Sequence, residues 1–63
     1  MVNMKFVEEA LWIKEQLDFL FPNEEHNVWI IYQNLEREGD FFREVYHNAL
    51  MAIVEHKKKN SSV

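Results

Sequence analysis

The chain has 63 residues and no cysteine. This absence excludes disulfide bonds and thiolate zinc sites and favours a reducing, cytoplasmic location. The longest apolar run, 28–32, has five residues, far short of the roughly 18 that a membrane-spanning helix needs. The first residues also lack the apolar block of a signal peptide. We therefore expect a cytoplasmic protein that does not interact with membranes.

The sequence also lacks the patterns that accompany catalysis. It has no cysteine nucleophile and no glycine-rich phosphate loop, and its two serines, Ser61 and Ser62, stand at the end of the chain. Glu44 and His47 are three residues apart, like the ligand pairs of di-iron carboxylate bundles. This spacing occurs once, and a helical wheel places both residues on a polar side. We expect no enzyme, no cofactor and no metal site, and no motif identifies a family.

Basic residues are few and unevenly placed. The chain carries 7 Lys plus Arg against 11 Asp plus Glu, and removing Lys57, Lys58 and Lys59 leaves 4 basic residues and a net charge of −7. Such a surface argues against direct nucleic-acid binding. It allows an alternative function, an acidic inhibitor that mimics nucleic acid and occupies the basic groove of another protein. Its candidate contacts are Glu8, Glu15, Asp18, Glu24, Glu25, Glu36, Glu38 and Glu44.

One proline and one glycine divide the chain into three segments with helical periodicity. Asn3 is a good N-cap, Pro22 ends the first segment, and Gly39 followed by Asp40 supplies a stop and a new start. We expect helices over about 3–20, 23–38 and 40–58 in a single domain of residues 1–58. Residues 59–63 are expected to form a disordered tail. The predicted fold is all-α, a small three-helix bundle or helical hairpin packed as a homo-oligomer.

Two other interpretations stay open at this point. Residues 28–32 are rich in β-branched and aromatic side chains, which is typical of a strand, although no second strand candidate exists to pair with it. The apolar rhythm also continues across Gly39, so residues 28–58 could form one long helix at a cost of about 1 kcal/mol for the glycine. We favour the break, because 36–38 is polar on all sides and Gly39-Asp40 carries both signals.

The periodicity assigns an inward face to each helix. The first face comprises Phe6, Ala10, Ile13, Leu17 and Leu20. The second comprises Val28, Ile31, Tyr32 and Leu35. The third comprises Phe42, Val45, Tyr46, Ala49, Ile53 and His56, widened by Phe41, Leu50 and Ala52. This third arc is broad enough to touch more than one neighbour.

Several large apolar residues remain after one small core is filled. On the helical wheels Trp12 and Phe19 turn away from the first face, and Trp29 and Ile30 leave the second. Large aromatics supply much of the binding energy of protein interfaces. We expect these four residues to contact a partner, either a second copy of the chain or another protein, unless some of them complete an irregular core. The predicted function is a small, non-enzymatic interaction or regulatory protein acting as a homodimer.

Overall fold

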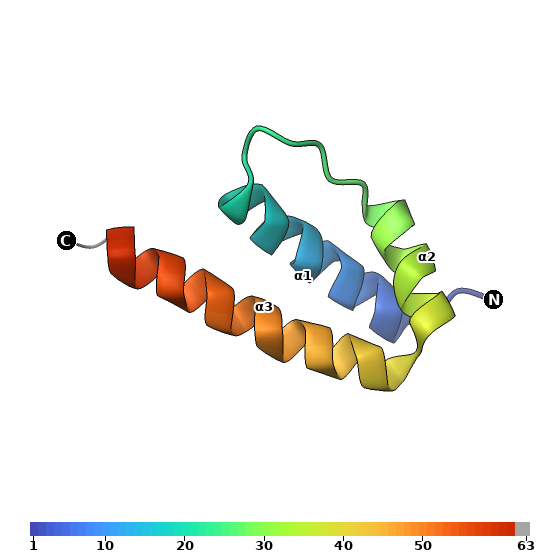
Figure 1. Cartoon of the computed structure of the whole chain (residues 1–63). Helices are drawn as coiled ribbons and strands as arrows, with labels where there is room; N and C mark the ends of the chain where they lie inside the picture. The colour runs from blue at the N-terminus through green and yellow to red at the C-terminus, as the bar shows by residue number, and fades with distance from the viewer. Residues whose placement is uncertain (62–63) are drawn as a thin grey trace.

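The computed structural model describes residues 1–61 and is all-helical over them. Its helices are α1 (Met4–Leu20), α2 (Val28–Glu38) and α3 (Asp40–Ser61) (Figure 1). Residues 28–32 lie in α2, so the strand interpretation of this segment is wrong. The predicted all-α class and three-helix count are confirmed for the described residues.

Two asparagines set where the first two helices begin. The side chain of Asn3 accepts a hydrogen bond from the backbone N–H of Lys5 at 3.0 Å, and Asn27 accepts from Trp29 and Ile30 at 2.8 and 3.3 Å. These bonds satisfy helix N–H groups that have no partner within the helix. The second helix therefore begins at Val28 and not near residue 23, and a connection of residues 21–27 precedes it.

Gly39 separates α2 from α3, as favoured from the sequence. Its φ of 96° belongs to a region that L side chains rarely adopt, and its N–H bonds to the carbonyl of Leu35 at 2.8 Å. A Cβ at Gly39 would meet nothing within 4 Å, so the glycine is required for its backbone angle and not for space. The continuous-helix alternative is thereby excluded.

The last helix extends past the expected end at residue 58. Residues 59–61 are helical, while 62–63 of the predicted disordered tail lie outside the described residues. Near this end the side chains of Asn60 and His56 lie 3.1 Å apart, one helical turn from each other. Residues 57–61 contain no glycine or proline, so no helix-breaking residue ends α3 at the lysines.

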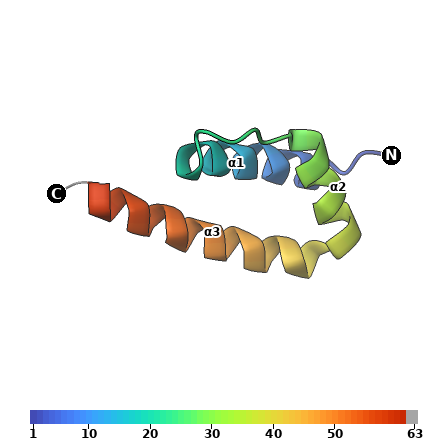
Figure 2. The ribbon, with the colours of Figure 1, turned by 45° about the horizontal axis from the view of Figure 1, so that its top comes forward.

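The helices form an open arrangement (Figures 1 and 2). α1 and α3 run alongside each other in the same direction, and α2 crosses at the end where both begin. The 21–27 connection returns along α1 to reach α2. The radius of gyration is 12.5 Å, against about 10.6 Å for a compact domain of this length. With α2 at one end only, much of the length of α3 has a single neighbour.

The core lies mainly between α1 and α2. Its buried members are Phe6, Ala10, Ile13, Tyr32, Leu35 and Leu50. Leu17, Leu20, Val28 and Ile31 are partly buried and pack around them. The inward faces predicted for the first two helices are therefore confirmed. The hydroxyl of Tyr32 accepts a hydrogen bond from the N–H of Asn3 at 3.2 Å and donates to Glu36 at 2.8 Å, which joins α2 to the start of α1.

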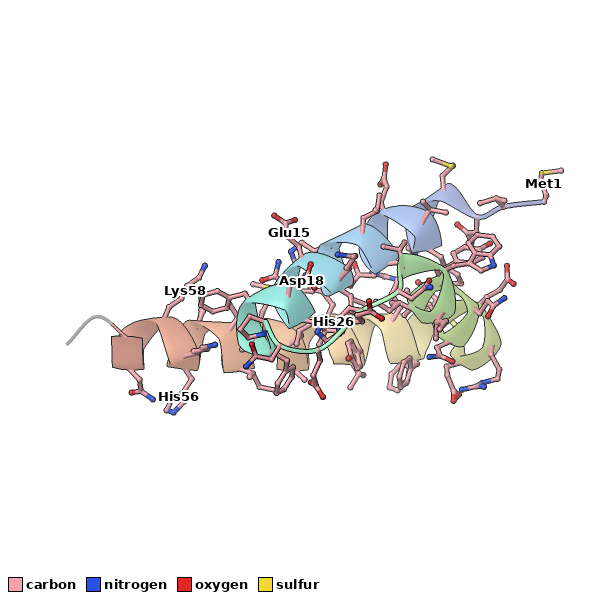
Figure 3. The ribbon with its side chains drawn as sticks, turned by 90° about the horizontal axis from the view of Figure 1, so that it is seen from above. Met1, Glu15, Asp18, His26, His56 and Lys58 are labelled. Atoms are coloured by element: carbon pink, nitrogen blue, oxygen red, sulfur yellow. The ribbon has the colours of Figure 1, made fainter. Side chains whose placement is uncertain are left out.

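The inward face predicted for α3 is correct only in part, because Leu50 and Tyr46 pack on the core but other members of that face do not. Val45 is 51% exposed and Ile53 is 54% exposed, whereas Leu50 and Val54 are buried. His56 is exposed as well, and in Figure 3 it projects from the opposite side of α3 to Lys58. Compared with the predicted orientation, α3 is rotated about its own axis. The reason is that polar side chains, described below, fix its contact with α1.

Asp40, in the first turn of α3, joins two cations. Its Oδ1 lies 2.9 Å from Nζ of Lys5 and 2.7 Å from Nε of Arg43. The hydrogen bonds from Lys5 and Arg43 hold the pKa of Asp40 below its ordinary value of 3.8, and the bond from Lys5 has the larger effect. A carboxyl whose folded pKa is depressed stabilises the fold above its unfolded pKa, and this stabilisation is lost as the pH falls through the folded pKa.

We therefore expect Asp40→Asn to be less stable than the unchanged chain at about pH 6, with the difference disappearing as the pH falls through the lowered pKa of Asp40. Because Asp40 is exposed, the difference is small and decreases with added salt. Urea unfolding followed by circular dichroism at several pH values measures it. A difference that did not change with pH would show that the carboxylate charge plays no part.

Candidate interaction surface

A buried carboxylate orients α3 against α1. Glu9 is only 8% exposed, and its Oε2 lies 2.8 Å from Nδ1 of His47, while Oε1 lies 3.9 Å from Nη1 of Arg43. The ring of His47 stacks on Trp12 with centroids 4.0 Å apart. Burying a carboxylate is costly unless it is paired and hydrogen-bonded. The rotation of α3 that supplies both partners is therefore the favourable one.

This contact also changes the interpretation of Glu44 and His47. His47 is directed to Glu9 on α1, so the spacing of three residues does not create a shared site with Glu44. In residues 1–61, no group of three or more histidine, aspartate or glutamate side chains is arranged to hold a metal ion.

The rotation leaves an apolar line exposed along α3. Phe42, Val45, Tyr46, Ala49 and Ile53 recur every three or four residues, and we call this line the α3 strip. Tyr46 is half-buried, and the other four are exposed. From Phe42 to Ile53 the strip is about 16 Å long. These are core-type residues at core-type spacing, and no helix within residues 1–61 covers them fully.

Two shallow hollows flank the strip and meet at Tyr46. The first, of about 100 Å³, lies toward α2 and is lined by Ile13, Ile31, Asn34, Leu35, Phe42 and Tyr46. The second, of about 190 Å³, lies toward the end of α1 and is lined by Leu17, Leu20, Phe21, Tyr46, Ala49, Leu50 and Ile53. Together they form an apolar groove along one side of the molecule. α2 is too short to cover its second half.

The structure places Trp12 and Phe19 against α3 of the same chain. Trp12 is half-buried, stacks on His47 and packs on the core. Phe19 is 40% exposed, and Nζ of Lys57 and of Lys58 lie 4.8 and 5.8 Å from its ring centroid. Lys57 also donates to the carbonyls of Phe19 and Leu20 at 2.8 and 3.3 Å, at the end of α1. Much of the surface of these two aromatics is thus occupied within the chain.

Trp29 and Ile30 lie on the outer side of α2, and both are 56% exposed. The ring of Trp29 stacks on Tyr32 with centroids 5.1 Å apart, which holds it in a fixed orientation. Ile30 borders a polar hollow with Lys14, Asp18 and Asn27. These two exposed residues lie on α2, apart from the α3 strip.

The acidic candidates do not form one patch. All eight are exposed, and they are distributed over every helix and the 21–27 connection. Asp18 pairs with Lys14 at 2.7 Å, and Glu36 accepts from Tyr32. Asp18, Glu24 and Glu25 line an open hollow of about 550 Å³ beside His26, and Figure 3 labels Asp18 and His26 there.

No protein-family model, curated protein or solved structure matches this chain. In the part of the chain that the structure describes, none of the helices is long and apolar enough to span a membrane. Its own surface is therefore the basis for assigning a function.

Sequence reasoning named the residues of the strip but assigned them to the core. The available signal was the width of the apolar arc on the third helix, which exceeds what one neighbour can cover. The contact between Glu9 and His47 had no signal, because the two residues are 38 positions apart.

Proposed function

We propose that this protein is a small, non-enzymatic interaction protein of a regulatory kind, and that its copies associate through the α3 strip. The observation that carries this proposal is the exposed apolar groove described above. Its lining is almost entirely hydrophobic, and it lies on ordered helices. Apolar surface of this extent is costly in water and is typical of protein interfaces.

The exposed pair Trp29 and Ile30 supports a second contact, with a different protein. Tryptophan buried in a fitted pocket is among the strongest contributors to binding. Self-association through the strip would leave this pair on α2 available.

A matched pair of substitutions tests the proposed surface. Ile53→Glu places a charge within the strip, whereas Met51→Glu places the same charge on an exposed position of α3 about half a turn away. We expect Ile53→Glu to reduce the mass measured by light scattering to that of one chain, with circular dichroism still helical. Met51→Glu should retain the mass of the unchanged protein. Equal behaviour of the two variants would refute a role for the strip.

The acidic-inhibitor alternative differs in its response to salt. Binding by a nucleic-acid mimic should weaken steeply between low and moderate salt, because exposed charges are screened. Apolar docking through the strip or through Trp29 should persist or strengthen. Acids spread over all surfaces give the alternative less support than a single acidic face would give.

A further inference from the structure

We propose that two copies pair antiparallel through their α3 strips, with the two-fold axis passing beside Ala49. This inference rests on the self-association proposed above and adds its geometry. It names the occupant of the groove as α3 of a second copy and fixes which residues meet.

The exposed surface area of the chain is larger than that of a compact monomer, as expected if a second copy covers part of it. The chain exposes 4857 Å², while a compact monomer of its 7.7 kDa mass exposes roughly 4300 Å². The surplus of about 500 Å² is of the order of the roughly 800 Å² that each partner contributes to a standard interface. The elongated shape, 46 × 23 × 15 Å, points the same way.

Three residues of the strip, Val45, Ala49 and Ile53, are symmetric about Ala49. Val45 precedes Ala49 by four residues and Ile53 follows it by four, so an antiparallel copy centred there places Val45 against Ile53 of the partner subunit. Alanine at the centre allows the two helices to approach closely, with larger side chains interlocking on each side. Isologous pairing of one patch with itself is also the commonest form of dimer.

The charges of α3 and of the residues just before it favour the antiparallel direction. Residues 36–44 contain four acids and two arginines and are joined by Lys5, which pairs with Asp40, so this end has a net charge of −1, whereas residues 55–59 contain three lysines and one glutamate, a net charge of +2. An antiparallel pair brings these oppositely charged ends together, and a parallel pair brings like ends together. The helix dipoles add to the preference in the same sense. This argument uses the net charge of each end, and Lys57 can keep its contacts with α1.

Engineered cysteines test the register, because the natural chain has none. We expect Ala49→Cys to form a disulfide-linked dimer on mild oxidation. Val45→Cys alone and Ile53→Cys alone should not link, since in each case the two sulfurs would be about 12 Å apart along the helices. An equimolar mixture of the Val45→Cys and Ile53→Cys chains should link. Met51→Cys, on the other side of α3, is the matched control and should stay unlinked.

The possible outcomes distinguish a failure of this inference from a failure of the self-association on which it rests. The reduced form of each variant is checked first for helicity and for mass. Linking of Val45→Cys with itself would indicate parallel pairing and overturn the inference. A two-chain mass without any cross-link at Ala49 would overturn the antiparallel register, whereas association through the strip is tested separately by Ile53→Glu against Met51→Glu. A one-chain mass for the unchanged protein would overturn both.

Discussion

Replacing Ile13 with alanine should leave the chain largely unfolded at room temperature. Ile13 is 1% exposed and lies where α1 meets both other helices. Truncating a buried isoleucine to alanine lowers the free energy of unfolding by about 2–5 kcal/mol, because apolar contacts are lost and a cavity remains. A single core in a domain of this length without disulfides rarely supplies more than about 3–5 kcal/mol of stability. The expected loss is therefore comparable to the total free energy of unfolding of the chain.

Leu11→Ala provides a control on the same helix, since Leu11 is mostly exposed. Its substitution should change the free energy of unfolding by less than about 0.5 kcal/mol. Both variants are compared with the unchanged chain by urea unfolding at one chain concentration, because association adds stability that depends on concentration. Similar midpoints for Ile13→Ala and Leu11→Ala would contradict the described core.

Replacing Glu9 with alanine should lower the free energy of unfolding by about 1–3 kcal/mol. The substitution leaves His47 without its hydrogen-bond partner Glu9 and removes the 3.9 Å ion pair with Arg43, at a contact where both side chains are partly withdrawn from water. The physical cost is mainly the unmet hydrogen bond of His47, since Arg43 keeps its hydrogen bond to Asp40. α3 should also lose its fixed rotation relative to α1.

Glu8→Ala is the natural control, because Glu8 is the exposed neighbour of Glu9 and has the same charge. Glu9→Gln keeps an acceptor oxygen and should fall between the two alanine variants. Thermal unfolding at low and high salt measures all three. Equal losses for Glu8→Ala and Glu9→Ala would mean that the buried contact adds nothing to stability.

The parts of the fold that were predictable depend on local signals. Spacings of three and four residues located the inward faces of α1 and α2, and the positive φ needed at Gly39 matches a residue without a side chain. The predicted start of the second helix near residue 23, just after Pro22, is wrong. Asn27, whose side chain caps two N–H groups, is the residue that starts it.

The orientation of α3 was not predictable from periodicity. Its apolar arc is wider than one contact, so the hydrophobic pattern alone permits several rotations. Glu9 and His47, distant in sequence, select one of them, and the apolar residues left over form the strip. The exposure of Trp29 and Ile30 was foreseen from their places on the wheel, and their binding to a partner stays a prediction.

Sedimentation equilibrium of the unchanged protein over a wide concentration range tests the central claim most directly. If the α3 strip is an interface between copies, the measured mass should reach twice the 7.7 kDa of one chain and decrease toward 7.7 kDa on dilution. A helical protein that stays at 7.7 kDa at every concentration would contradict the claim.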